Sequence, residues 1–149
     1  MASISTTLLP ERVIDIPNGK DREGVLESLV GTLSAGREEI DAERLIQAVL
    51  EREALASTGF GDGLAMPHVR LDGVSRFYAA LGRTRAGVEF HAIDGAPVHL
   101  LLLIVGPEGE RTRYQRLLGS AATFLKAEGT RLKECDDLVT EVGSALLEY

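Results

Sequence analysis

The chain has 149 residues, of which 44% are apolar and 26% are charged, a composition typical of a globular domain and not of a disordered segment. Its net charge of −7 disfavours nonspecific binding to nucleic acid or to anionic lipid, because both need clustered cations. The single cysteine, Cys135, excludes an intramolecular disulfide and a cysteine-based metal cluster.

The first ten residues are the least regular part of the sequence. They contain no basic segment followed by an apolar stretch, which is the pattern of a secretion signal. We expect a flexible N-terminal arm over 1–10 and one domain over 11–149. Without a secretion signal, the expected location is the cytoplasm.

The rest of the chain alternates between patterns of strands and patterns of helices. Apolar residues at helical spacing, preceded by Asp41 as an N-cap, indicate a helix, whereas the apolar run 100–105 does not alternate and indicates a strand covered on both faces. That run is too short to cross a bilayer, so we expect no membrane insertion. The predicted elements are a strand at 13–16, a helix from Val25 that ends near Gly36, a helix from Asp41 to near Arg52 and Glu53, an extended piece at 64–66, strands at 76–83 and 97–105, and helical sequence from about Arg111 to the end, where Thr130 could cap a short separate helix.

The order of these elements indicates the fold class. One strand, two helices, several strands and then helices predict an α/β protein, namely a three-layer α/β/α sandwich. Its central sheet is expected to be mixed and to have about four to five strands.

The segment STGFGDGLAMPHVR, Ser57 to Arg70, fits neither a regular helix nor an ordinary strand. Its three glycines allow tight turns and leave amide N–H groups free to face an anion, and for this reason Gly63 is a candidate supporting residue. Met66 and Pro67 stiffen the backbone that enters His68. A stiffly held imidazole beside accessible amides suits a nucleophile that takes up a phosphoryl group.

The stretch from Glu53 through Phe60-Gly61-Asp62-Gly63-Leu64-Ala65-Met66-Pro67-His68 resembles the active-site signature of the type 2 IIA components (EIIA) of the bacterial phosphotransferase system. These are the fructose/mannitol class and its nitrogen-regulatory relatives. The turn at 88–98 also resembles the family's entry into a long apolar strand. The resemblance covers about residues 10–148.

The resemblance implies specific roles for several side chains. His68 would accept a phosphoryl group, and Arg52, at the family's arginine position, would face that phosphate with its planar donors. Arg70 either adds positive potential or is simply solvated. Where family members carry a second histidine, this chain has Tyr114, which either donates a hydrogen bond to the phosphoryl group or only packs on the core.

Other reactive residues have plainer explanations. His91 and His99 could join His68 in a metal site, but strand placement explains them more simply and no carboxylate has the expected ligand spacing. We therefore expect no metal and no cofactor. Cys135 fits a small buried side chain better than a phosphorylated thiol.

Two functions follow from the resemblance. The first is a phosphorylation-switched regulator that takes phosphate from a histidine-phosphocarrier protein and changes its affinity for a target protein. The alternative is a IIA component of a fructose/mannitol-type sugar uptake system that passes phosphate to a IIB component. The chain lacks a fused acceptor domain, a membrane segment and the second histidine, which favours the regulator.

Overall fold

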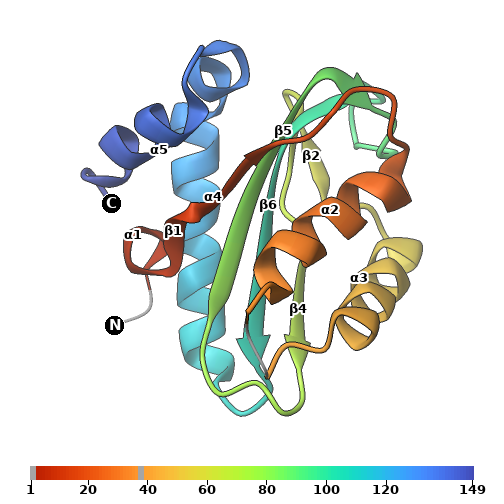
Figure 1. The fold of residues 1–149 in the computed structure, drawn as a ribbon, viewed down its shortest axis with the longest axis vertical. Coiled ribbons are helices and arrows are strands. Elements are labelled where there is room, and N and C mark those ends of the chain that lie inside the picture. Colours follow the sequence, from red (N-terminus) through yellow and green to blue (C-terminus); the bar gives the residue numbers. More distant parts are fainter. Residues whose placement is uncertain (1–2, 37–38) are drawn as a thin grey trace.

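A six-stranded mixed β-sheet forms the centre of the computed structural model, with helices on both faces (Figure 1). The structure describes residues 3–36 and 39–149. The elements in chain order are α1 (Ile4–Thr7), β1 (Leu8–Asp15), α2 (Arg22–Ser34), α3 (Ala42–Leu55), β2 (Gly59–Gly61), β3 (Leu64–Ala65), β4 (His68–Leu71), β5 (Tyr78–Val88), β6 (Val98–Pro107), α4 (Arg111–Glu134) and α5 (Leu138–Leu146). Among the helices of these residues, none is long and apolar enough to cross a membrane.

The sheet has the strand order β1-β5-β6-β3-β2, and β4 also pairs with β6. β1 runs parallel to β5, β5 antiparallel to β6, and β3 and β4 both parallel to β6. β3 and β4 thus follow one another along the same edge of β6, joined by Met66 and Pro67. The mixed sheet is as predicted, although it contains six strands instead of four to five, because the glycine segment itself supplies short strands.

The apolar run at 100–105 is buried on both faces, as predicted. Leu100, Leu102 and Ile104 belong to the core under α4 and α5, whereas Leu101, Leu103 and Val105 belong to the core under α2 and α3. Successive residues of a strand point to opposite faces, so one unbroken apolar run serves both cores. The three-layer α/β/α sandwich is confirmed.

The helix α3 begins directly after Asp41, the cap that the sequence predicts. The Asp41 carboxylate accepts from the backbone N–H groups of Glu43 and Arg44, and the Asp21 carboxylate caps α2 in the same way. At the other end of the chain, α4 is one continuous helix through Thr130, so the prediction of a separate short helix there is wrong. A mid-helix threonine can continue a helix when both neighbouring turns are packed, and Leu125 and Leu132 are fully buried.

The expectation of a flexible arm over 1–10 is wrong for the described residues. Residues 1 and 2 lie outside them, but α1 and the start of β1 pack on the sheet, and Ile4 and Leu8 are buried in the core under α4. The Ile4 N–H donates to Ser120 Oγ at 3.2 Å, and Leu8 pairs with Ala79 of β5. These contacts reach across the whole chain, so no local pattern indicates them.

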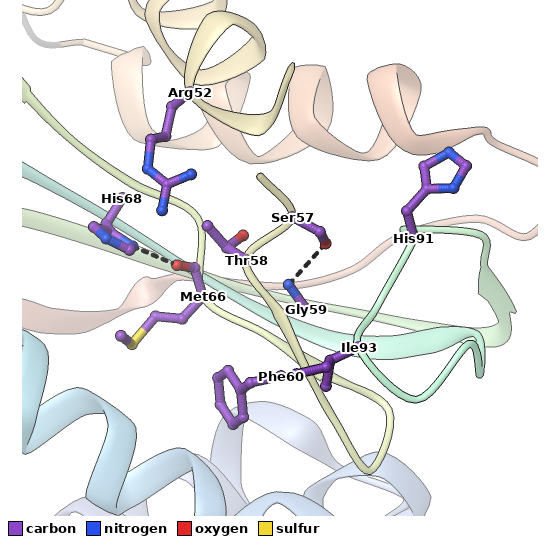
Figure 2. A pocket seen from close by; sticks show the side chains of 9 residues that line it. All are labelled: Arg52, Ser57, Thr58, Gly59, Phe60, Met66, His68, His91 and Ile93. Carbon is purple, nitrogen blue, oxygen red and sulfur yellow. Dashed lines mark hydrogen bonds between the residues drawn. The ribbon is translucent and has the colours of Figure 1, made fainter. Parts of the chain in front are cut away.

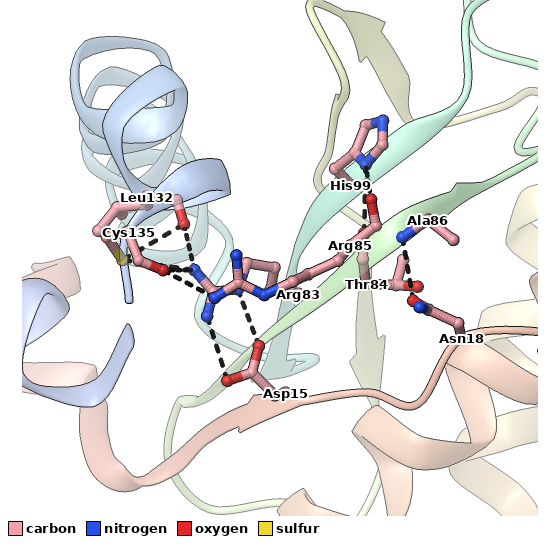
Figure 3. Close-up of polar contacts among 9 residues, drawn as sticks. All are labelled: Asp15, Asn18, Arg83, Thr84, Arg85, Ala86, His99, Leu132 and Cys135. Atoms are coloured by element: carbon pink, nitrogen blue, oxygen red, sulfur yellow. Dashed lines mark hydrogen bonds and ion pairs between the residues drawn. The ribbon is translucent and has the colours of Figure 1, made fainter. Parts of the chain in front are cut away.

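Arg83 of β5 is fully buried and joins three distant parts of the chain (Figure 3). Its guanidinium donates to both carboxylate oxygens of Asp15 at 2.8 and 3.2 Å. It also donates to the backbone oxygens of Leu132 at 3.0 Å and Cys135 at 2.6 Å, where α4 ends. One side chain therefore fixes β1, β5 and the C-terminal end of α4 against one another.

Candidate phosphoryl-acceptor site

His68 begins β4, and the preceding backbone holds its ring. Opposite it on β6 lies Ile104, whose N–H donates to the Pro67 carbonyl at 3.0 Å. The His68 Nδ1 lies 2.7 Å from the Met66 carbonyl oxygen (Figure 2). Because a carbonyl oxygen only accepts, Nδ1 must carry the ring proton, and Nε2 keeps a lone pair. The stiff Met66-Pro67 entry thus selects one tautomer.

A chain of hydrogen bonds connects this carbonyl to a buried carboxylate. Glu53, in the last turn of α3, is 3% exposed and accepts from both the N–H, at 3.2 Å, and the hydroxyl of Thr58. The Thr58 carbonyl accepts from the Met66 N–H at 3.1 Å, and the Met66 carbonyl accepts from His68. Glu53 therefore anchors the loop that sets the position of the His68 ring.

Burial lowers the pKa of His68, and the charge of Arg52 lowers it further. The hydrogen bond to Met66 and the charge of Glu53 act in the opposite direction without reversing the shift. A lowered pKa keeps the imidazole neutral at neutral pH. The ring is then ready to attack through Nε2 without a separate base.

Two adjoining hollows meet at His68 and Arg52, which line both of them. The first has a volume of about 490 Å³ and is lined on its other sides by the glycine segment, Met66 and Ile93 (Figure 2). The second has a volume of about 790 Å³ and extends toward Arg70 and Tyr114. Arg52 Nη1 donates to the Ala56 carbonyl at 2.8 Å, which leaves the other donors of its guanidinium for a ligand.

Tyr114, at the start of α4, stands beside the His68 ring. The two ring centroids are 6.2 Å apart and the planes are tilted by 51°. Burial raises the pKa of Tyr114 to about 12, against the opposing charges of Arg70 and Arg52. The hydroxyl therefore stays protonated, and can donate a hydrogen bond, throughout the physiological range. The Arg70 guanidinium lies 5.7 Å from the Tyr114 ring centroid and donates to the Glu108 carbonyl at 3.0 Å.

Gly63 lies apart from this group and lines neither hollow. With φ at +75° it closes the turn between β2 and β3, and its carbonyl accepts from the N–H groups of His99 and Leu100. The loop amides are also less available than predicted. The Gly59 N–H donates to Ser57 Oγ at 3.0 Å, and the Asp62 N–H to Asp94 at 3.1 Å. The glycines shape the loop, and these amides hold it together.

The other two histidines have separate surroundings. His91 is exposed at the rim of the first hollow, and its Nδ1 lies 3.7 Å from Glu89. His99 Nδ1 lies 3.2 Å from the Thr84 carbonyl (Figure 3). In the part of the chain that the structure describes, no three His, Cys, Asp or Glu side chains are placed to hold a metal ion.

Glu53 and Thr58 are positioning residues: the family signature begins at Glu53, but the sequence alone assigns no role to either residue. A signal for Glu53 was present, because a carboxylate in the last turn of a helix is unfavourable with the helix dipole and needs a local partner. The partner, five residues further on, lies beyond the helix, so helical spacing does not identify it.

The chain matches known proteins over most of its length. Residues 7–137 match the model of the family described as "Phosphoenolpyruvate-dependent sugar phosphotransferase system, EIIA 2". A nitrogen regulatory protein of Pseudomonas aeruginosa is 35% identical over 132 residues, which cover 88% of this chain and 85% of that protein. A fructose-specific EIIA component of Haloferax volcanii is 32% identical over 130 residues, 86% of this chain and 84% of that one.

The structure of the chain is also similar to solved structures of this family. The crystal structure of the nitrogen regulatory protein IIA-Ntr of Neisseria meningitidis superposes with a TM-score of 0.85 at 28% identity, covering 96% of this chain and 98% of that one. The segment that matches the family model includes the glycine loop, His68 and Tyr114. The chain therefore belongs to the type 2 EIIA family of the phosphoenolpyruvate-dependent sugar phosphotransferase system.

Proposed function

We propose that the chain is a cytoplasmic histidine phosphocarrier domain that takes its phosphoryl group on Nε2 of His68. The observation that carries this proposal is the hydrogen bond between His68 Nδ1 and the Met66 carbonyl, which leaves Nε2 with the lone pair. The donor is a histidine-phosphocarrier protein, as the family's function implies.

The transfer needs no cofactor. The Nε2 lone pair of His68 attacks the phosphorus of the donor's phosphohistidine, a new N–P bond forms, and the donor's N–P bond breaks with its electron pair returning to the donor ring. The proton on Nδ1 of His68 stays in place, and its bond to Met66 stabilises the positive charge that the ring gains. Arg52 faces the phosphoryl oxygens from the end of α3, since it lines both hollows beside His68.

Apolar side chains around the site suit docking of a protein donor. Leu55, at the end of α3, is 84% exposed and lines the second hollow, and Ile93 is 86% exposed and lines the first. Exposed apolar residues beside a charged pocket are typical of protein contact surfaces. A phosphoryl group adds roughly −1.5 to −2 charges at the centre of this surface, which is enough to switch partner affinity.

The tyrosine beside His68 favours the regulatory role. Tyr114 can hold a phosphoryl oxygen by one hydrogen bond but, with a pKa of about 12, cannot exchange protons as an imidazole does. An arrangement that holds phosphate without helping it to leave suits a protein read by its phosphorylation state. Transfer to a IIB component of a fructose-type system is the second candidate, and the 32% identity to a fructose-specific EIIA supports it.

The test is phosphoryl labelling with phosphoenolpyruvate, the general phosphotransferase enzyme and its carrier protein. One acid-labile phosphoryl group should appear, and ¹H–¹⁵N correlation spectra of the rings should place it on Nε2 of His68. His68→Ala should abolish labelling, while His91→Ala and His99→Ala serve as matched controls that keep it. Labelling that survives in His68→Ala, or a phosphoryl group on Nδ1, would contradict the proposal.

A second experiment separates the two roles. Labelled protein is mixed with a fructose-type IIB component, and loss of its phosphate is timed with and without that acceptor. Transfer within seconds supports the sugar-uptake role. Persistence of the label, with a binding partner that distinguishes the phosphorylated from the unphosphorylated form, supports the regulator.

A further inference from the structure

β1 contains an irregularity that turns one arginine inward. Leu8 pairs with Ala79 and Val13 pairs with Leu81, so five residue steps along β1 cover only two along β5. The additional residues bulge out of the ladder, and bulges of this kind re-aim side chains. Within this bulge lies Arg12, which is only 5% exposed although its neighbours Pro10 and Glu11 are exposed.

Arg12 is a buried cation without a counter-charge among the described residues. Its Nε is buried and has no hydrogen-bond partner there. The guanidinium carbon of Arg12 lies 5.4 Å from the centroid of the Tyr78 ring. The face of an aromatic ring attracts a cation, but it does not replace a hydrogen-bond acceptor for the Nε–H group. Burying a charge without a partner is costly, and an anion bound beside Arg12 would offset that cost.

The side chain lines a hollow of about 260 Å³ that contains two further arginines. Arg76 comes from the segment before β5 and Arg113 from the first turn of α4, and Thr6, Thr7 and Ser75 add hydroxyl or amide groups. Two carboxylates lie close to Arg76 and Arg113 and offset part of their charge, whereas among the described residues no ion pair reaches Arg12. Glu39 accepts from Ser75 and Tyr78, and Glu110 lies 3.6 Å from Arg113.

We propose that this hollow is a binding site for a small phosphate-bearing anion, separate from the His68 site. Three arginines line a space that is large enough for a phosphate group and a few further atoms. Guanidinium groups favour phosphate because their planar donors match its oxygens. The residues of this hollow and those of the two hollows at His68 are different, so the two sites can be occupied independently.

The experiment titrates inorganic phosphate and, in a second arm, glycerol phosphate into ¹⁵N-labelled protein at constant ionic strength. The backbone amides of Thr6, Thr7 and Ser75 should shift along a saturating curve. Tighter binding of glycerol phosphate would identify a phosphorylated metabolite as the ligand, and equal binding would identify free phosphate. Shifts near Ser57 and His68 report separately on any phosphate beside Arg52.

Arg12→Met keeps the length of the side chain and removes the charge. It should weaken binding at the new site about tenfold or more, since it removes hydrogen bonds to a charged ligand. The shifts near His68, and labelling of His68, should be unchanged. Arg111→Met, on an exposed residue that lines none of these three hollows, is the matched control and should bind as the wild type does.

Three results would overturn the proposal. They are equal phosphate-induced shifts in the wild type and Arg12→Met, shifts that do not saturate, and equal shifts with chloride or acetate, which would mean nonspecific anion binding. If Arg12→Met does not fold, Arg76→Met and Arg113→Met provide the same test from the rim of the hollow. Each should weaken phosphate binding, and unchanged binding in both would also overturn the proposal.

Discussion

Replacing Glu53 tests whether a buried carboxylate at the end of α3 positions the His68 ring. Glu53→Ala removes the acceptor of two hydrogen bonds and leaves the N–H and hydroxyl of Thr58 without it, at a residue that is 8% exposed. A hydrogen bond to a charged group contributes about 1.5–3 kcal/mol, and the two bonds share one carboxylate, so we expect a total loss of about 3 kcal/mol. For a domain of this size the melting temperature should fall by about 6–12 °C.

The loss should also reach the reactive ring. Thr58 bonds Met66, and Met66 bonds His68, so a displaced Thr58 releases the carbonyl that fixes the tautomer. We expect the initial rate of His68 labelling to fall about tenfold or more in Glu53→Ala, because a misplaced nucleophile loses its attack geometry. Urea denaturation measures the first effect, and timed labelling well below the melting temperature measures the second.

Two further variants make the result specific. Glu53→Gln keeps the shape and one acceptor, and its amide can donate to the Thr58 hydroxyl, so it should recover most of the stability and rate. Glu134→Ala removes an exposed carboxylate from the last turn of α4 and should change stability by less than about 0.5 kcal/mol. If Glu53→Ala loses stability but labels at the wild-type rate, the positioning argument is wrong, and if it loses no stability, the hydrogen-bond argument is wrong.

Three other predictions concern the site and the sheet. If the Tyr114 hydroxyl donates a hydrogen bond to the phosphoryl group, Tyr114→Phe should speed the loss of phosphate from labelled protein about tenfold to hundredfold. Tyr114→His should speed transfer of the phosphoryl group to an acceptor. Equal rates in the wild type and both variants would mean that the Tyr114 ring only packs on the core. The pKa of His68 is lowered in the folded state, so the unfolded chain binds the proton at a higher pH than the folded chain does. The free energy of unfolding should therefore fall as the pH drops from about 7 through the folded pKa. Urea denaturation at several pH values should show a weaker decline for His68→Ala than for the wild type. Gly82→Ala would place a Cβ 2.6 Å from the Ile16 side chain and 2.9 Å from the Leu29 side chain, and it should lower the free energy of unfolding by about 1–3 kcal/mol. Gly119→Ala lies on an exposed face of α4 where, among the described residues, the added Cβ meets no atom within 4 Å beyond its chain neighbours and the helix backbone, and it should raise the free energy of unfolding by about 0.5–1 kcal/mol. Equal melting temperatures for the two variants would contradict the packing argument.

The features that are predictable from the sequence are those set by neighbouring residues. The cap at Asp41, the unalternating run at 100–105 and the stiff entry into His68 depend on local spacing or on local backbone restriction. The family resemblance points to Arg52 and Tyr114, and both lie near the His68 ring in the structure, while their roles toward a phosphoryl group stay predictions.

The remaining features depend on contacts between distant residues. Ile4 is buried because α4 lies above it, and Arg83 is buried because the end of α4 supplies acceptors. Neither fact has a local signature, and an arginine in a strand usually indicates an exposed face. Gly63 shows the opposite error, because a glycine that only closes a turn looks the same in the sequence as one that faces a ligand.

The bonds of Arg83 have a consequence for the order in which the protein folds. They connect Asp15, Arg83 and residues 132–135, so they can form only after the two ends of the chain have met on β5. We expect contacts of such long range to form late in folding, after the transition state. Loss of contacts that are absent from the transition state raises the unfolding rate and leaves the folding rate unchanged. Arg83 should thus determine how long the folded protein lasts rather than how fast it forms, and in stopped-flow kinetics Arg83→Leu should raise the unfolding rate while the refolding rate stays unchanged.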